Sequence, residues 1–230
     1  MCSSDLSLDI NFSTEEGGGY TALYLACSVN HIELVKFLLS NERVDVNKAL
    51  NNGDNPFLRA CSAGNLEVLQ LLLNDKRIHV NARDLFGHTG FHLACLNNRC
   101  EVIKLLLEDG RIDIHIPNED YYTPIISACW NASIEVVELI LASGEHIDLN
   151  QQTRDKKTAK DLITQKSFFD DSDMIERKET ILHLLEAYER DRIGITFQLQ
   201  KKLGRLGNFF IIVLNIHFFK RNISIFFFFF

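Results

Sequence analysis

The chain has 230 residues, of which 46% are hydrophobic and 24% are charged, as is ordinary for a folded protein. Its formal net charge of −7 argues against nucleic acid as a partner, because nucleic-acid-binding domains present a basic face. The first residues contain neither a basic segment nor an apolar run, so we expect no signal peptide there.

Residues 1–18 resemble the end of the units that follow them. They contain Leu8-Asp-Ile-Asn11 and then a Gly17-Gly-Gly19 turn, but no helix pair comes before this segment. Two interpretations stay open: residues 1–18 form a partial repeat that caps a stack, or the sequence begins inside a longer array. The second is favoured, because a capping repeat needs a polar outer face and the first full copy has the composition of an internal one.

Residues 19–156 contain four copies of one unit. Their bounds are 19–52, 53–86, 87–120 and 121–156. The copies are in register at an interval of 34 residues, which separates Cys27, Cys61, Cys95 and Cys129. A fixed period of this length is typical of a solenoid, in which each unit buries its apolar face only by stacking on its neighbours.

Each copy reads as two short helices followed by a loop. The residues predicted at the N-cap of the first helix, where a side-chain oxygen accepts a backbone N–H, are Thr21, Asn55, Thr89 and Thr123. The residues predicted to adopt positive φ in the turn between the helices are Asn30, Gly64, Asn98 and Ala132. The second helix carries leucines on one face at helical spacing, and a Val-Asp-Val-Asn segment then leads into a hairpin-like finger.

The unit resembles the ankyrin repeat. The family pattern G-x-T-P-L-H-x-A appears as Gly19-Tyr-Thr-Ala-Leu-Tyr-Leu-Ala26 and again from Gly53 and Gly87, whereas the fourth copy has Tyr121 in place of the glycine and keeps Thr123-Pro124. The resemblance covers about residues 8–190. It implies an all-α fold, an α-solenoid of stacked helix-turn-helix repeats with short β-hairpin fingers. It also implies a non-catalytic module that binds a protein partner.

Residues 157–192 look like a fifth, degenerate copy that closes the stack. Residues 157–163 match the start of the unit, and residues 166–178 form a charged insertion that we expect to be mobile. An amphipathic helix is predicted over Thr180–Tyr188, as is typical of a C-terminal cap. The residues that this helix directs inward are Ile181, Leu184, Leu185 and Tyr188.

We expect residues 193–230 to be an unstructured, phenylalanine-rich tail. Residues 199–230 contain no Asp or Glu and hold nine of the chain's 17 phenylalanines. Three interpretations stay open: a tail with no selected structure, a membrane-associating segment, and a helix that packs on the stack. The apolar run over residues 208–219 is shorter than the roughly 20 residues that a membrane span needs. A membrane-associated protein whose repeats form its cytosolic part is the alternative function.

The cysteine positions favour packing over chemistry. Each repeat cysteine follows an alanine in the first helix, where a free cysteine acts as a small buried hydrophobe. We therefore expect reduced thiols and a cytoplasmic, intracellular location. His92, Cys95 and Cys100 are close enough in sequence for a nucleophile pair or a metal site, but the resemblance implies a structural hydrogen bond for His92. We expect no catalytic residue, no metal and no cofactor.

The candidate binding surface follows from the resemblance, which implies a concave face made by the finger tips and the exposed side of the first helices. By register, the contact residues in the third and fourth copies are Leu85, Phe86, His88, Leu96, Asn97, Tyr122, Trp130 and Asn131. Trp130 is expected at the centre, because Ser28 and Ser62 fill its position in two other copies and the stack does not need the ring. Exposed aromatic residues on one ridge are typical of protein-binding hot spots. We expect a monomer that holds one protein partner. Membrane contact through the tail is the disfavoured alternative.

Overall fold

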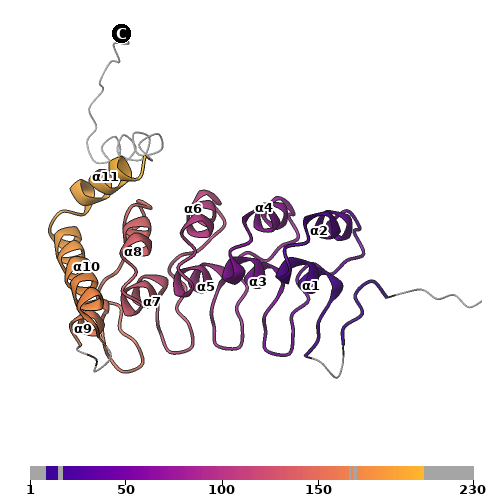
Figure 1. The fold of residues 1–230 in the computed structure, drawn as a ribbon, viewed down its shortest axis with the longest axis horizontal. Helices are drawn as coiled ribbons and strands as arrows, with labels where there is room; N and C mark the ends of the chain where they lie inside the picture. The colour runs from indigo at the N-terminus through magenta and orange to yellow at the C-terminus, as the bar shows by residue number, and fades with distance from the viewer. Residues whose placement is uncertain (1–8, 15–17, 166, 168–169, 205–230) are drawn as a thin grey trace, which may run out of the picture.

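The computed structural model describes residues 9–14, 18–165, 167 and 170–204, and these contain eleven α-helices (Figure 1). The helices are α1 (Ala22–Ser28), α2 (Ile32–Leu39), α3 (Pro56–Ala63), α4 (Leu66–Asn74), α5 (Gly90–Leu96), α6 (Cys100–Glu108), α7 (Pro124–Trp130), α8 (Ile134–Leu141), α9 (Ala159–Thr164), α10 (Ser172–Arg190) and α11 (Arg192–Lys202).

The helices form a stack of pairs. The first helices of successive units, α1, α3, α5, α7 and α9, pack side by side in one row, which we call the inner row. The second helices, α2, α4, α6 and α8, form an outer row, and the loops between units project away from it as fingers (Figure 1). This arrangement confirms the predicted α-solenoid.

The predicted N-cap positions and turn residues are confirmed in all four units, and the predicted capping bond is confirmed in three of them. Thr21, Asn55 and Thr89 each accept a hydrogen bond from the backbone N–H three residues on, which satisfies a donor at the helix start. The fourth N-cap, Thr123, makes no such bond, and its buried Oγ1 has no partner within the described residues. The four turn residues all have positive φ; they are Asn30, Gly64, Asn98 and Ala132.

The core is continuous along the stack and contains the repeat cysteines. Cys27, Cys61, Cys95 and Cys129 are buried and free, and burial raises the pKa of each thiol. Each outer helix contributes at least one fully buried valine, such as Val68 in α4. The cysteines therefore act as packing residues, as the sequence predicted.

The fingers are tight loops that are shorter than β-hairpins. In the described residues, strand pairing is limited to a single antiparallel bridge between Arg83 and Thr89. Adjacent fingers are joined by one backbone hydrogen bond each, for example from Leu85 N to Asn52 O at 3.1 Å and from Glu119 N to Phe86 O at 2.9 Å. These bonds hold the finger tips in a row along the stack.

The C-terminal end differs from the expected boundaries. Helix α10 begins at Ser172, so that the second half of the insertion expected at residues 166–178 is helical rather than mobile. Ile181, Leu185 and Tyr188 are buried as expected, and Leu184 is half-buried.

Helix α11 also occupies the first part of the tail that we expected to be unstructured from residue 193. Its side chains satisfy carbonyl groups at the end of α8: Thr196 Oγ1 donates to Leu141 O at 3.1 Å, and Gln200 Nε2 donates to Ala142 O at 2.8 Å. Helix α11 is therefore stabilised by the last carbonyl groups of α8, which lack partners within their own helix. The composition of the tail gives no sign of these contacts. Residues 205–230, on which the three interpretations of the tail depend, lie outside the described residues. Within the described part of the chain, no helix is both long and apolar enough to cross a membrane.

Candidate functional site

Three of the large apolar side chains predicted at the binding surface are exposed. Leu85 is 68% exposed and Phe86 66% exposed at a finger tip, and Trp130 is 54% exposed at the end of α7. We call this surface the finger face; it consists of the finger tips and the exposed positions of α1, α3, α5 and α7. Asn97 is exposed, and Leu96 and Asn131 are half-buried on the same helices. Asn131 donates from Nδ2 to Leu96 O at 2.9 Å, and this bond ties two units together.

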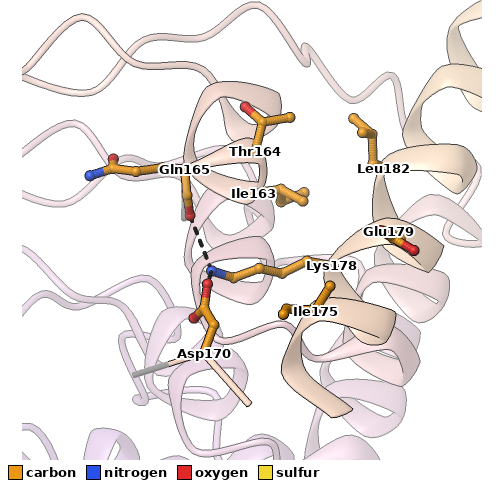
Figure 2. Close-up of a pocket in the computed structure, with 8 residues that line it drawn as sticks. All are labelled: Ile163, Thr164, Gln165, Asp170, Ile175, Lys178, Glu179 and Leu182. Atoms are coloured by element: carbon orange, nitrogen blue, oxygen red, sulfur yellow. Dashed lines mark hydrogen bonds and ion pairs between the residues drawn. The ribbon is translucent and has the colours of Figure 1, made fainter. Parts of the chain in front are cut away.

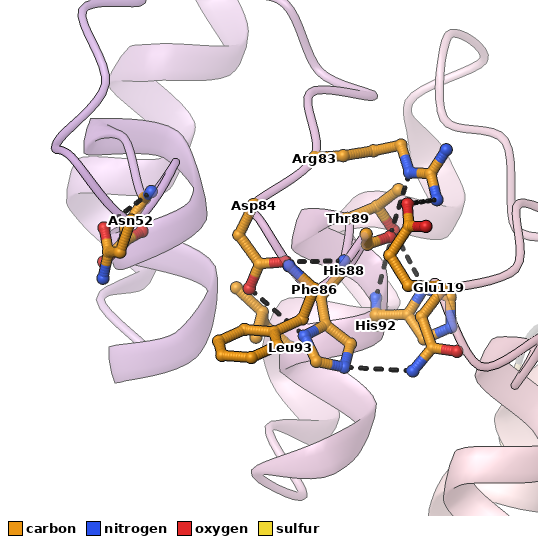
Figure 3. A network of polar contacts seen from close by, with 12 residues as sticks. Asn52, Arg83, Asp84, Phe86, His88, Thr89, His92, Leu93 and Glu119 are labelled. Carbon is orange, nitrogen blue, oxygen red and sulfur yellow. Dashed lines mark hydrogen bonds and ion pairs between the residues drawn. The ribbon is translucent and has the colours of Figure 1, made fainter.

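The finger that carries Leu85 and Phe86 is held by charged side chains at its base (Figure 3). Asp84 Oδ1 accepts hydrogen bonds from Phe86 N at 2.9 Å and from His88 N at 2.8 Å. Arg83 donates from Nε to Gly87 O at 3.1 Å and pairs with Glu119 of the next finger at 3.0 Å. The exposed side chains at this tip therefore stand on an ordered backbone.

His88 has two hydrogen-bond partners and is half-buried, so it supports the finger rather than facing a partner. Its Nδ1 lies 3.1 Å from Asp84 Oδ2, and its Nε2 lies 3.2 Å from Asn118 Nδ2 (Figure 3). Asn118 Oδ1 accepts from Asp120 N and Tyr122 N, which fixes the amide so that its NH₂ faces the ring. His88 Nε2 is therefore an acceptor and Nδ1 is the donor.

The exposed tyrosine of the fourth copy is Tyr121, not Tyr122 as the sequence predicted. Tyr122 is half-buried against the core, and burial raises the pKa of its hydroxyl. Position 122 points inward because its backbone is fixed on both sides, by Asn118 and by His92. Tyr121 is 52% exposed and has a φ of 62°, at a position where the three other copies have a glycine that also has positive φ: Gly19, Gly53 and Gly87.

Two exposed residues of the finger face were absent from the predicted set. Leu25 on α1 and Val29, the residue that follows the last turn of α1, are 48% and 70% exposed. They share the stripe of the inner helices that carries Ser62 and Trp130 in later copies. The sequence could have predicted both residues, because the 34-residue interval aligns these positions of the first copy with the surface positions of the later copies.

Trp130 borders a hollow where the fourth unit meets the C-terminal helices. The hollow has a volume of about 420 Å³, and Leu162 of α9 and Met174 of α10 line its apolar side. A smaller hollow of about 190 Å³ is also lined by Asp170 and Lys178, which form an ion pair in which Lys178 Nζ is 2.7 Å from Asp170 Oδ2 (Figure 2). This contact with Lys178 holds the pKa of Asp170 below its usual value. The hollow was not foreseen, because α9 and α10 reach Trp130 only in the tertiary structure.

The residues that the sequence offered for a nucleophile pair or a metal site are buried or half-buried in the stack. His92 is fully buried, donates from Nε2 to Tyr122 O at 2.7 Å, and has its pKa lowered to about 4 by burial. The Cys95 thiol is buried and its pKa is raised well above the usual value, so the reactive thiolate is disfavoured. Burial also raises the pKa of Cys100 to about 11.

One metal-like spacing escaped the sequence analysis: His88 and His92 are four residues apart, and their ring centroids lie 5.8 Å apart. Both rings already hold protein partners, and the described residues contain no group of three potential metal ligands.

The comparisons with known proteins agree with this architecture. A family model described as ankyrin repeats (3 copies) matches residues 5–84 and 76–153, which together cover more than half of the chain. No curated protein matches the sequence. The inner and outer rows, the capped turns and the family match lead to one conclusion: the chain belongs to the ankyrin repeat family.

Proposed function

We propose that this protein is a non-catalytic binding module that holds a protein partner on its finger face, with Trp130 and Phe86 as the main anchors. Ankyrin repeats are in general protein–protein interaction modules. The observation that carries the proposal is that several large apolar side chains are exposed at the finger tips and along the inner helices that form this face: Leu25, Val29, Leu85, Phe86, Tyr121 and Trp130. Scattered exposed apolar residues need no explanation, whereas aromatic residues grouped on a rigid ridge are typical of binding surfaces.

The rigidity of the ridge supports the proposal. Leu85 and Phe86 stand on a finger that Asp84 and Arg83 hold by four hydrogen bonds to backbone and side chains. Trp130 stands at the end of α7, whose other residues are buried. A partner would therefore lose little free energy to the ordering of the surface that it binds.

The hollow beside Trp130 supports a more specific contact. Its size of about 420 Å³ and its apolar wall of Trp130, Leu162 and Met174 suit one large aliphatic or aromatic side chain of the partner. We place the hot spot at this junction, because an anchor that fills a pocket contributes more than one that lies on a flat surface.

We also propose that the protein is located in an intracellular, reducing compartment. Four buried cysteines are kept as thiols, and their regular spacing puts them in separate units. Reduced thiols in a chain of this kind support an intracellular, reducing location.

The test is affinity capture from source cells with the tagged full chain and three variants. Trp130→Ala and Phe86→Ala each remove an anchor and should weaken capture of the partner roughly 30-fold, as expected for the loss of about 2 kcal/mol at a hot spot. Phe37→Ala is the matched control, because Phe37 on α2 has the same 66% exposure as Phe86 but lies off the finger face.

All three variants should keep the helicity of the parent chain. A partner that the parent captures and that both finger-face variants retain equally well would refute the proposal. Equal loss of the partner in the Phe37→Ala control would also count against it, since binding would then not be specific to this face.

A further inference from the structure

The inner helices of the four complete units carry one side chain that is charged at neutral pH, and it lies at a finger-face position. Helices α1, α3, α5 and α7 contain no Asp, Glu or Lys, and Arg59 of α3 is their only arginine. Arg59 occupies the position that Leu25 fills in the first copy and Leu93 in the third, and α3 packs between the two helices that carry these leucines (Figure 1). Arg59 therefore interrupts an apolar stripe of the finger face.

The stack does not use the charge of Arg59. Its side chain is half-buried, makes no hydrogen bond or ion pair with the described residues, and has a buried Nε without a partner. The other copies have Leu25, Leu93 and Ser127 at this position, and their helices pack in the same row. Because a donor without an acceptor costs free energy, an acceptor that a partner brought to this guanidinium group would offset that cost.

Asp54 does not supply this acceptor. Its charge interacts with that of Arg59, but the two side chains do not form an ion pair. Asp54 Oδ2 accepts from the Tyr24 hydroxyl at 2.7 Å, and its Oδ1 is buried. Burial raises the pKa of the Asp54 carboxyl, although Arg59 acts in the opposite direction. The carboxylate of Asp54 is therefore held within the stack, and the guanidinium group of Arg59 is left without an acceptor.

A second arginine lies at the end of α3. Arg99 is exposed in the turn after α5, and it donates from Nε to Ser62 O at 3.1 Å. Its side chain crosses Gly64, where a Cβ would lie 3.0 Å from Arg99 Cδ. Asn65, at the same position of the second copy, makes a similar bond to Cys27 O with a neutral amide, so the bond itself does not need a charge. The Nη1 and Nη2 atoms of Arg99 make no hydrogen bond within the described part of the chain.

We propose that Arg59 and Arg99 bind carboxylate groups, and that the partner docks along α3 with an acidic residue of a peptide segment. The inference rests on the function proposed above: apolar residues of the segment contact the finger face, and its Asp or Glu pairs with the arginines. A guanidinium group binds a carboxylate through two parallel hydrogen bonds, which fixes the position of the segment along the face.

The two arginines select among partners. A purely apolar segment would cover both guanidinium groups without giving them an acceptor, which is unfavourable, and a basic segment would be repelled. The chain's net charge of −7 does not prevent binding of an acidic segment, because charges are screened over about 8 Å at physiological salt. A carboxylate at α3 therefore responds mainly to the groups beside it.

The test selects ligands from a displayed library of random, unmodified peptides, with the full chain as bait. Peptides enriched by the parent chain should carry Asp or Glu beside apolar residues. Peptides enriched by Arg59→Glu should carry Lys or Arg at that place instead, because the charge that they meet is reversed. Arg43→Glu is the matched control, since Arg43 is an exposed arginine that follows α2 and lies off the finger face, and it should leave the acidic preference unchanged.

Affinity measurements give the second readout. The most enriched peptide is compared with a copy in which its acidic residue is replaced by the neutral amide, and this copy should bind the parent chain about tenfold more weakly. The difference should shrink in Arg99→Met, whose exposed side chain the fold does not need, and should vanish when Arg59→Met is added. Urea unfolding checks that methionine at position 59, between Leu25 and Leu93, keeps the fold.

The inference and the proposed function fail in different ways. Enriched peptides that need Trp130 and Phe86 but show no acidic preference would overturn the inference alone. The same holds if the acidic residue contributes equally to affinity in the parent chain, in Arg99→Met and in the double variant. If no peptide is enriched, or if enriched peptides bind Trp130→Ala and Phe86→Ala as tightly as the parent, the proposed function fails and the inference fails with it.

Discussion

Replacing His92 with leucine should remove much of the acid sensitivity of this fold. His92 is fully buried in α5, and burial lowers its pKa from 6.5 to about 4. Its Nε2 donates to the carbonyl of Tyr122, so the ring serves as a neutral link between the third unit and the next finger. Acid protonates this ring readily in the unfolded chain and only with difficulty in the folded one.

The sign and size of the effect follow from these pKa values. Between pH 6.5 and about 4 the unfolded chain binds a proton that the folded chain does not, so stability is complete above pH 6.5 and is lost as the pH falls through this range. A pKa difference of 2.5 units corresponds to about 3 kcal/mol, of which roughly 2.5 kcal/mol should be lost between pH 7 and pH 4.5.

Leucine is the appropriate replacement, because Leu58 fills the same position in the second copy and is fully buried there. Urea unfolding of the parent and of His92→Leu is followed at pH 7 and at pH 4.5 by the fluorescence of Trp130, the single tryptophan of the chain. The free energy of unfolding of the parent should fall by about 2.5 kcal/mol more than that of the variant. Equal losses in the two proteins would refute the reasoning, since His92 would then not carry the linkage.

Four further changes test the packing. Cys61→Ser should cost about 1–3 kcal/mol, because the hydroxyl enters an apolar seam without a partner, and native Cys61 should resist a thiol reagent that labels it rapidly in urea; rapid native labelling would contradict the burial. Ala132→Gly should change the free energy of unfolding by less than about 1 kcal/mol, because relief of the strain at φ 49° is offset by the loss of a methyl group that is 1% exposed. Tyr121→Gly should instead stabilise the fold by about 0.5–1 kcal/mol, since its side chain is exposed and only the strain is removed; a lower urea midpoint would show that the Tyr121 ring packs on the fingers. Trp130→Ala should leave the urea midpoint nearly unchanged, and unfolding of that variant would mean that the ring belongs to the core.

The sequence by itself determined the repeated part of this protein. The 34-residue interval placed each repeat cysteine, each N-cap and each turn residue correctly, because equivalent positions of every unit pack against equivalent positions of the neighbouring units. Even Ala132 could be predicted to adopt positive φ, although alanine disfavours it, since the three residues at its position in other copies are Gly or Asn.

Tertiary structure decided the features that depend on contacts between unlike parts of the chain. The side chain of Tyr122 turns inward because Asn118 and His92 hold its backbone. Helix α11 forms where composition suggested a tail, because Thr196 and Gln200 find carbonyl groups at the end of α8. The hollow beside Trp130 exists only because α9 and α10 meet the end of α7. The repeat pattern predicts the buried positions inside each unit, because those contacts recur in every unit. The ends of the stack and its exposed surface depend on contacts between residues that are far apart in sequence, and no local pattern predicts those contacts.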